Sequence, residues 1–255
     1  MPLAWIHRLE ARAIARELEA PLATCDSRLK GGPFLLRLSD PEMLRVTDEL
    51  TRAGIAYHGP RAAVMQMCYD KLQATRLAEA DGIACPRTLP GDAADRLDFP
   101  LIVKPRRGSD SIGLRLVRKG PLPARYRTSQ YLVQEYVRGR EITVALIATR
   151  IGRPLEVVLP PGTTYSFARK YLRRPRREPL QDVALAARVR ESALKLARRF
   201  AVNWAARLDF IGEPGGRLCF LECDVAPMIA QGSAFAESLA AAGIERAEQL
   251  RLLTS

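Results

Sequence analysis

The sequence contains only two histidines, His7 and His58, and both lie far from the acidic residues near the C-terminus. No Ser–His or Cys–His arrangement of the catalytic kind is found, and the cysteines have no histidine partners for a zinc site. The five cysteines are odd in number and scattered. This pattern argues against a disulfide framework and favours the reducing cytosol, so we expect a cytoplasmic protein.

Aromatic residues are also scarce, at 6% of the chain, and they do not alternate with basic residues. Stacking on nucleic-acid bases therefore has little support. No apolar run approaches the length of a membrane helix, and no signal-peptide pattern opens the sequence, so no membrane partner is expected. The 255 residues and the hydrophobic content of 47% predict a globular protein of two or three subdomains.

Positive charge is abundant, because the formal net charge is +12. Six basic residues lie between Arg169 and Arg177 with Pro175 among them, which predicts an exposed basic loop. The basic residues of the following helix are explained by simple solvation. The excess of positive charge predicts attraction to anions, and it leaves a nucleic-acid-binding module open as a less favoured alternative.

Three carboxylates gather on two predicted strands near the C-terminus. Asp209 lies on the first strand, and Glu222 and Asp224 lie on the second, after a Pro-Gly-Gly turn. Residues two apart on a strand share a face, so Glu222 and Asp224 point the same way, and the turn brings Asp209 alongside. Oxygen ligands without histidine suit Mg²⁺, or Mn²⁺, better than Zn²⁺. The alternative is a group of solvated acids at a sheet edge.

A second group of residues begins at Lys104, the only charge at the end of the apolar strand that starts at Phe99. Gly108, Ser109, Ser111 and Gly113 follow it in a Gly/Ser loop whose backbone N–H groups are suited to bind phosphate. The alternative is an ordinary hairpin turn. The loop is not a Walker-type P-loop, because the Gly-Lys-Ser/Thr tripeptide does not occur.

The third group lies between Tyr131 and Ala148, where a strand, a turn and another strand are predicted. The backbone from Glu135 to Val137 is suited to hydrogen-bond a flat heterocycle, and Glu141 is suited to accept hydrogen bonds from ribose. Taken alone, this stretch reads as an ordinary β-hairpin with charged edges.

The remaining elements are predicted from hydrophobic periodicity. Alternating strands and helices up to about residue 60 indicate a small α/β unit. The predicted strands cover residues 2–6, 34–38 and 54–60, and a β-rich stretch covers residues 99–159; the predicted helices cover residues 8–20, 41–53, 70–80, about 181–202, and a region from 234 onward.

The order of these groups along the chain resembles the ATP-grasp superfamily, over roughly residues 60–245. The resemblance is closest to the D-alanine–D-alanine ligases and the glutamate-adding ligases. It implies an ATP-grasp fold of the α/β (α+β) class, in which two α+β subdomains grip ATP. The expected boundaries are a short Rossmann-like unit at 1–60 and an ATP-grasp domain at 61–255, with a small subdomain at about 85–137 and a large one at about 138–255.

The resemblance also assigns roles. Phosphate-binding lysines would be Lys71, Lys104 and, at the γ-phosphate, Lys170, with residues 108–113 as the covering loop. The adenine hinge would include Gln134, Glu135, Tyr136 and Val137, and Glu141 would bind ribose. Arg207 would stabilise the reaction intermediate, while Asp209, Glu222 and Asp224 would hold two Mg²⁺ ions. Ser233 would contact the substrate carboxylate.

Together these features predict an ATP-dependent carboxylate–amine ligase that works through an acyl phosphate on small-molecule substrates. Two departures stand out: Asp224 replaces the usual asparagine, and Met228 replaces a glycine that often follows. The unit up to residue 60 lacks the glycine-rich substrate loop, so we do not expect D-alanyl-D-alanine as the product. A nucleotide-binding protein without catalysis is the alternative, and a homodimer is left open.

Overall fold

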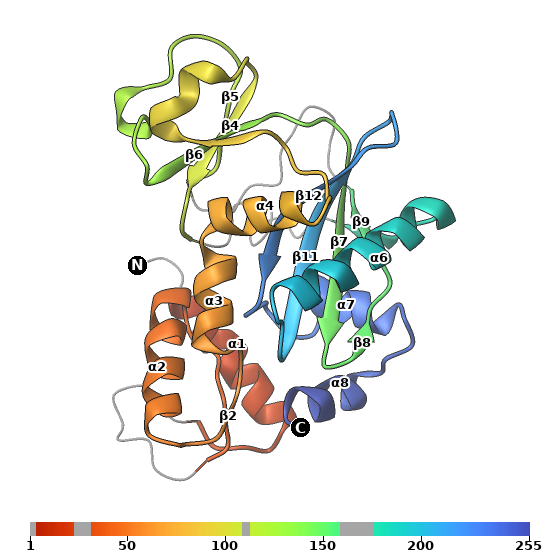
Figure 1. Cartoon of the computed structure of the whole chain (residues 1–255). Helices are drawn as coiled ribbons and strands as arrows, with labels where there is room; N and C mark the ends of the chain where they lie inside the picture. Colours follow the sequence, from red (N-terminus) through yellow and green to blue (C-terminus); the bar gives the residue numbers. More distant parts are fainter. Residues whose placement is uncertain (1–3, 23–31, 109–112, 159–175) are drawn as a thin grey trace.

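The computed structural model describes residues 4–22, 32–108, 113–158 and 176–255. In this part of the chain the strands form three separate sheets, and Figure 1 shows the smallest beside the N-terminal helices and the other two above and to its right. These sheets follow one another along the chain. The domain boundaries expected above stay a prediction.

The N-terminal unit holds a two-stranded parallel sheet, β1 (Phe34–Leu35) with β2 (Tyr57–His58), and the helices α1 (Ala4–Glu17) and α2 (Asp40–Arg52). Helix α2 agrees with the predicted helix to within one residue. The strand predicted at residues 2–6 is wrong at residues 4–6, which belong to α1. A short apolar run does not distinguish a strand from a helix, and here Ile6, Glu10 and Ile14 are buried at helical spacing.

Two helices connect this unit to the rest of the molecule: α3 (Ala62–Tyr69) and α4 (Lys71–Ala80). They meet at Asp70, whose carboxylate accepts a hydrogen bond from the Gln73 backbone N–H at 3.2 Å and so caps α4. Helix α4 confirms the helix predicted at residues 70–80, whereas α3 was not predicted. Lys71 therefore begins a helix at a fixed position between the N-terminal unit and the two larger sheets.

The small sheet has the antiparallel order β3-β6-β4-β5. Its strands are β3 (Thr88–Pro90), β4 (Leu101–Pro105), β5 (Arg115–Val117) and β6 (Tyr131–Glu135), with the 3₁₀ helices η1 (Gly91–Arg96) and η2 (Ala124–Tyr126) beside them. Leu101, Val103 and Val133 form its core. Strand β4 thus carries Lys104 within the sheet, and the Gly/Ser loop joins β4 to β5.

The large sheet has the order β10-β9-β7-β11-β12, and β8 pairs with β7. Its strands are β7 (Arg140–Ile147), β8 (Arg150–Ile151), β9 (Leu155–Val157), β10 (Arg177–Pro179), β11 (Ala205–Gly212) and β12 (Leu218–Asp224). The hairpin predicted for residues 131–148 is wrong, because β6 belongs to the small sheet and β7 to the large one. The turn between them passes from one sheet to the other.

Helices cover both faces of the large sheet (Figure 1). Alternate residues of β7 pack on opposite sides, as expected for a strand buried on both faces. Ile142 and Val144 pack in a core with α6 (Val183–Arg199), α3 and α4, whereas Ala145 and Ile147 pack in a second core with α1, α7 (Ala234–Ala240) and α8 (Arg246–Leu253). The helices predicted at about 181–202 and after 234 are confirmed.

Candidate active site

The predicted hairpin near the C-terminus is confirmed, and it carries the acidic residues as expected. Strands β11 and β12 pair antiparallel, with Asp209 opposite Glu222 and Arg207 opposite Asp224. The register shifts between Asp209 and Phe210, because Phe210 pairs with Phe220 and Leu221 is the extra residue of a β-bulge. Because of this extra residue, the β12 side chains after Leu221 point to the opposite face of the sheet from the one that strict alternation would give them. Phe220 therefore points into the core, whereas Glu222, two residues later, does not.

Arg207 lies at the centre of these carboxylates. Its guanidinium contacts Asp209 at 2.9 Å, Asp224 at 3.3 Å and Glu222 at 3.6 Å. Burial alone would lower the pKa of Arg207, but the three carboxylates outweigh it and hold the pKa well above its usual value. Asp209 also accepts a hydrogen bond from the Thr143 hydroxyl at 2.7 Å. Three carboxylates and one guanidinium leave two negative charges in excess.

The donor chemistry of this cluster fits a divalent cation, but the arrangement is not a complete cage. Among the described residues, no three His, Cys, Asp or Glu side chains converge closely enough to hold a metal ion by themselves. Mg²⁺ commonly takes one or two carboxylates and completes its shell with waters and phosphate oxygens. The expectation that Asp209, Glu222 and Asp224 hold metal stays a prediction, and it requires ligands from a bound nucleotide.

Lys71 and Gly108 lie across from the acidic strand. The Lys71 ammonium donates a hydrogen bond to the carbonyl oxygen of Gly108, at the start of the Gly/Ser loop. Arg106 binds Asp70 through two nitrogens, at 2.7 and 2.8 Å. Burial would raise the pKa of Asp70, but the hydrogen bonds from Arg106 and Gln73 lower it below its usual value. The start of α4 is thus joined to the base of the loop.

The backbone of the Gly/Ser loop has the geometry that its glycines permit. Gly108 has φ of +135° and Gly113 has φ of +74°, both in the region that favours glycine. Ser109 and Ser111 lie outside the described residues, as does Lys170, so their expected phosphate contacts stay predictions.

Lys104 is buried within β4, with only 7% of its surface exposed. Burial lowers its pKa to about 8, the positive charge of Lys71 acts in the same direction, and the carboxylate of Glu222 opposes both. A buried ammonium without a close anionic partner is costly. The site therefore contains a lysine whose charge a bound anion would stabilise.

The hinge expected at residues 134–137 lies where β6 leaves the small sheet. The Glu135 N–H bonds to the Arg87 carbonyl at 3.0 Å, and the Tyr136 N–H bonds to the Pro100 carbonyl at 3.1 Å. In the described part of the chain the Val137 N–H has no such backbone partner. The Gln134 amide donates to the Thr88 hydroxyl at 2.7 Å, and the Glu135 carboxylate pairs with Arg217 at 2.9 Å. These contacts hold residues 134–136 in place, and the expected adenine contacts of residues 134–137 stay a prediction.

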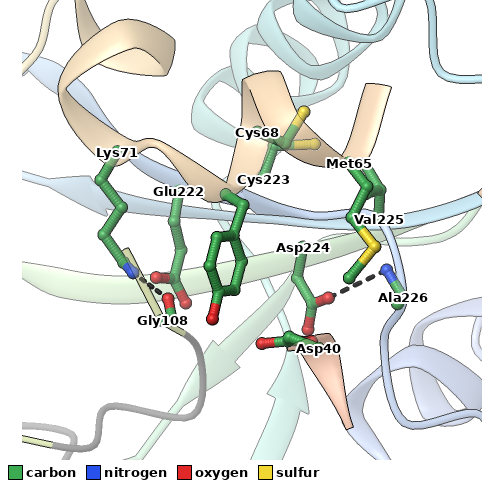
Figure 2. A pocket seen from close by; sticks show the side chains of 11 residues that line it. Asp40, Met65, Cys68, Lys71, Gly108, Glu222, Cys223, Asp224, Val225 and Ala226 are labelled. Carbon is green, nitrogen blue, oxygen red and sulfur yellow. Dashed lines mark hydrogen bonds between the residues drawn. The ribbon is translucent and has the colours of Figure 1, made fainter. Parts of the chain in front are cut away.

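A solvent-open cleft, with about 430 Å³ of empty space when the open solvent at its mouth is included, joins the two walls (Figure 2). Lys71 and Gly108 line one side, Glu222 and Asp224 line the other, and Asp40 at the start of α2 closes one end. Further lining comes from Met65, Cys68, Tyr69, Cys223, Val225 and Ala226. Burial and the negative charge of Asp40 raise the pKa of Tyr69. The cleft thus brings residues expected to bind phosphate and residues expected to bind metal into one space.

The sequence matches a family described as "D-ala D-ala ligase C-terminus" over residues 77–253, more than half of the chain. The chain belongs to this family. It is therefore an ATP-grasp ligase, of the class that forms carbon–nitrogen bonds.

The similarity of this chain to individual known proteins agrees with its membership of the family. A D-alanine–D-alanine ligase of Gloeobacter violaceus is 29% identical over 75% of this chain and 70% of its own length. The enzyme of that name from a Synechococcus strain is 26% identical, covering 91% and 79%. The crystal structure of the Bacillus anthracis D-alanine–D-alanine ligase superposes with a TM-score of 0.79 over 97% of this chain and 92% of that chain, at 22% identity. The predicted ATP-grasp fold is confirmed.

Three further predictions for this ligase concern residues outside the cleft lining. Ser233 caps α7, because its hydroxyl accepts a hydrogen bond from the Ala236 N–H at 3.1 Å, and its substrate contact stays a prediction. Glu141 lies on β7 between β9 and β11. Of the basic loop, Arg176 and Arg177 are described, and both form ion pairs, with Glu178 and Glu237.

Sequence reasoning missed some residues of the site. Asp40 lies far from the other motifs along the chain, and only its position at the start of a helix after a strand could have drawn attention to it. Thr143 was read as part of a strand, although it faces Asp209 across the pairing of β7 with β11. The described residues include no helix long and apolar enough to cross a membrane.

Proposed function

We propose that this chain is an ATP-dependent carboxylate–amine ligase that joins two amino acids, or closely related small molecules, through an acyl phosphate. The observation that carries the proposal is the single cleft with Lys71 and Gly108 on one wall and Glu222 and Asp224 on the other. The crystal structure of the Bacillus anthracis D-alanine–D-alanine ligase complexed with ATP, which has this fold, supports ATP as the nucleotide. We place the reaction in the cytoplasm.

In the first step, the carboxylate of one substrate attacks the γ-phosphate of ATP, which gives an acyl phosphate and ADP. Lys71 and Lys104 would neutralise the phosphate oxygens, and the Val137 N–H would bind the adenine ring. Mg²⁺ held by Asp209, Glu222 and Asp224, when bound, would neutralise further phosphate charge. The cost of burying Lys104 would be recovered when its ammonium pairs with phosphate.

In the second step, the amine of the other substrate attacks the acyl phosphate and inorganic phosphate leaves. Arg207 would stabilise the oxyanion of the tetrahedral intermediate, because its guanidinium is buried and remains charged. The carboxylates of the cluster keep Arg207 in position. No covalent nucleophile of the protein is required, which agrees with the scarcity of histidine.

We propose the substrates only as a chemical class, amino acids or closely related small molecules. Relatives named D-alanine–D-alanine ligase and a structure named VanG D-Ala:D-Ser ligase share the fold or the family, so D-amino acids head the set to be tested. The missing glycine-rich loop and the replacements at Asp224 and Met228 argue for an acceptor different from D-alanine. A nucleic-acid role has less support, because arginines such as Arg140, Arg217 and Arg246 pair with carboxylates.

The test measures ADP and phosphate release with ATP, Mg²⁺ and pairs drawn from D-alanine, D-serine, D-lactate, L-glutamate and small amines. Release that requires both a carboxylate and an amine supports the proposal, and mass spectrometry of the product identifies the pair. Asp209→Asn should abolish release, whereas Asp95→Asn, at a solvent-exposed ion pair with Arg127, should not. ATP binding without ADP release for any pair would instead favour a nucleotide-binding protein without catalysis.

A further inference from the structure

The segment between β12 and α7, residues 225–233, has no regular secondary structure, yet much of it is buried. Val225, Pro227 and Ile229 are among its buried residues. It directly follows Asp224 and ends at Ser233, so it joins the acidic cluster to the residue expected at the substrate carboxylate. Buried backbone groups outside helices and sheets need other hydrogen-bond partners. We call residues 225–233 the β12–α7 segment.

Two charged side chains of the N-terminal unit supply those partners. The Glu10 carboxylate, on α1, accepts hydrogen bonds from the backbone N–H groups of Ile229 and Ala230. Arg37, just after β1, donates from Nη2 to the Pro227 carbonyl at 2.8 Å. Arg37 and Glu10 also bind each other, with Nε 3.0 Å from Oε2. The pair therefore binds three backbone groups of the segment, the Pro227 carbonyl and the N–H groups of Ile229 and Ala230.

The pair is almost completely enclosed, with 3% of the Arg37 side chain and none of the Glu10 side chain exposed. Buried ion pairs are weak sources of stability, because desolvation offsets the attraction, and apolar replacements of both partners are often neutral. Arg37 Nη1 is, in addition, buried without a hydrogen-bond partner among the described residues. A contribution to stability therefore does not explain well why Glu10 and Arg37 are buried together. Their hydrogen bonds to the β12–α7 segment explain it directly, because they hold that segment in place.

The segment is also connected to the acidic cluster. The Ala226 N–H donates to Asp224 Oδ1 at 3.1 Å, so a shift of the segment would move this carboxylate. Lys71 and Lys104, by contrast, are positioned by α4 and β4, which the pair does not touch. A defect in the pair should reach the nucleotide end of the site only through Asp224, whereas it should displace the backbone of the segment itself, so the amino-acid end should be affected more.

We propose that Glu10 and Arg37 are positioning residues that hold the β12–α7 segment in the geometry needed to bind the amino-acid substrates. This inference rests on the proposed ligase function. It assigns to the N-terminal unit a role in the reaction although neither side chain lines the cleft.

The test compares the double variant Glu10→Met/Arg37→Met with the wild type and with Arg45→Met/Glu49→Met, a matched control at an exposed ion pair on α2. Three quantities are measured: the thermal unfolding midpoint, hydrogen exchange of a peptide covering residues 225–233, and the KM values for ATP and for the amino acid. D-Alanine serves as the probe, or the fastest pair of the panel above if D-alanine releases no ADP.

We expect the double variant to fold, to lose protection at Ile229 and Ala230, and to change its KM for ATP much less than its KM for the amino acid. Its kcat/KM for the amino acid should fall by about 100-fold, the loss typical of a misplacement of about 1 Å. If the double variant does not fold, Arg37→Lys keeps the charge but not the planar fork that reaches Pro227, and it should show the same selective loss.

Unchanged amino-acid kinetics in a folded variant, or unchanged protection of the segment, would overturn this inference and leave the proposed ligase function intact. A parallel rise of both KM values would also overturn it, because that pattern indicates general damage. A wild type that releases no ADP with any pair would instead overturn the proposed function, and the inference would fall with it.

Discussion

Replacement of Lys104 by methionine should make the unliganded protein more stable and the nucleotide site weaker. Methionine has a similar length and no charge, so it fits the position in β4 without the cost of burying an ammonium group. The pKa of Lys104 falls from 10.5 to about 8 on folding. Since one pH unit corresponds to ~1.4 kcal/mol, Lys104→Met should raise the free energy of unfolding at pH 7 by up to about 3 kcal/mol.

The stability that Lys104→Met gains over the wild type should decrease as the pH rises. The folded-state pKa of Lys104 lies below the unfolded value, so between pH 8 and 10.5 the unfolded chain binds more protons than the folded one. Wild-type stability should therefore rise with pH across this window. The advantage of Lys104→Met should be largest below pH 8 and should vanish near pH 10.5.

Urea unfolding at several pH values measures the stability change, and calorimetric titration with Mg²⁺-ATP measures the affinity. Loss of a charge-assisted hydrogen bond to phosphate should weaken ATP binding by roughly 2 kcal/mol, or about 30-fold. Lys119→Met, at an exposed lysine, is the control and should change neither quantity. A less stable Lys104→Met protein at pH 7, or one with an unchanged pH slope, would refute the burial argument.

Three further substitutions test the scaffold. Gly91→Ala should destabilise the protein by about 3 kcal/mol in urea unfolding, because its Cβ would lie 1.9 Å from the Tyr126 carbonyl oxygen; wild-type stability would contradict this packing. Asp70→Asn should cost about 2 kcal/mol by removing the charge-assisted pair with Arg106, while the asparagine oxygen can still cap α4. Because the folded pKa of Asp70 is lowered, that difference should shrink as the pH falls below about 3.8, and a constant difference would argue against it. Phe200→Ala, at a fully buried ring, should cost about 4 kcal/mol by thermal unfolding, and a cost below about 1 kcal/mol would indicate collapse of the cavity.

The sequence predicts the site best where the chemistry is local. The sequence pattern identifies the strand that carries Lys104 and leads into the glycine loop. It also identifies the two strands that carry Asp209 and Glu222. The structure brings Gly108 of this loop and Glu222 to one cleft with Lys71, and the order of motifs in an ATP-grasp chain anticipates that arrangement. The division of residues 131–148 between two sheets follows from the same resemblance, since local pattern alone favoured a hairpin.

Other features depend on tertiary context and could not be predicted. The bulge at Leu221 has no glycine or proline to mark it, yet it decides that Glu222 faces the site while Phe220 faces the core. Glu10 and Arg37 bind a segment 190 to 220 residues away in the sequence, and no pattern signals contacts at that separation. Helix α1 packs against the second core through Ile14, a tertiary contact that the short apolar run at its start does not reveal.

The contacts of the β12–α7 segment bear on how this ligase could be re-engineered. Arg246 of α8 donates to the Ile229 carbonyl, and Arg177 of β10 donates to the Gly232 carbonyl, so the segment also depends on two elements outside the N-terminal unit. A chimera that exchanges the N-terminal unit for that of a relative would have to carry partners equivalent to Glu10 and Arg37. Grafting the β11–β12 hairpin and the segment after it alone into another scaffold would leave these backbone groups without partners.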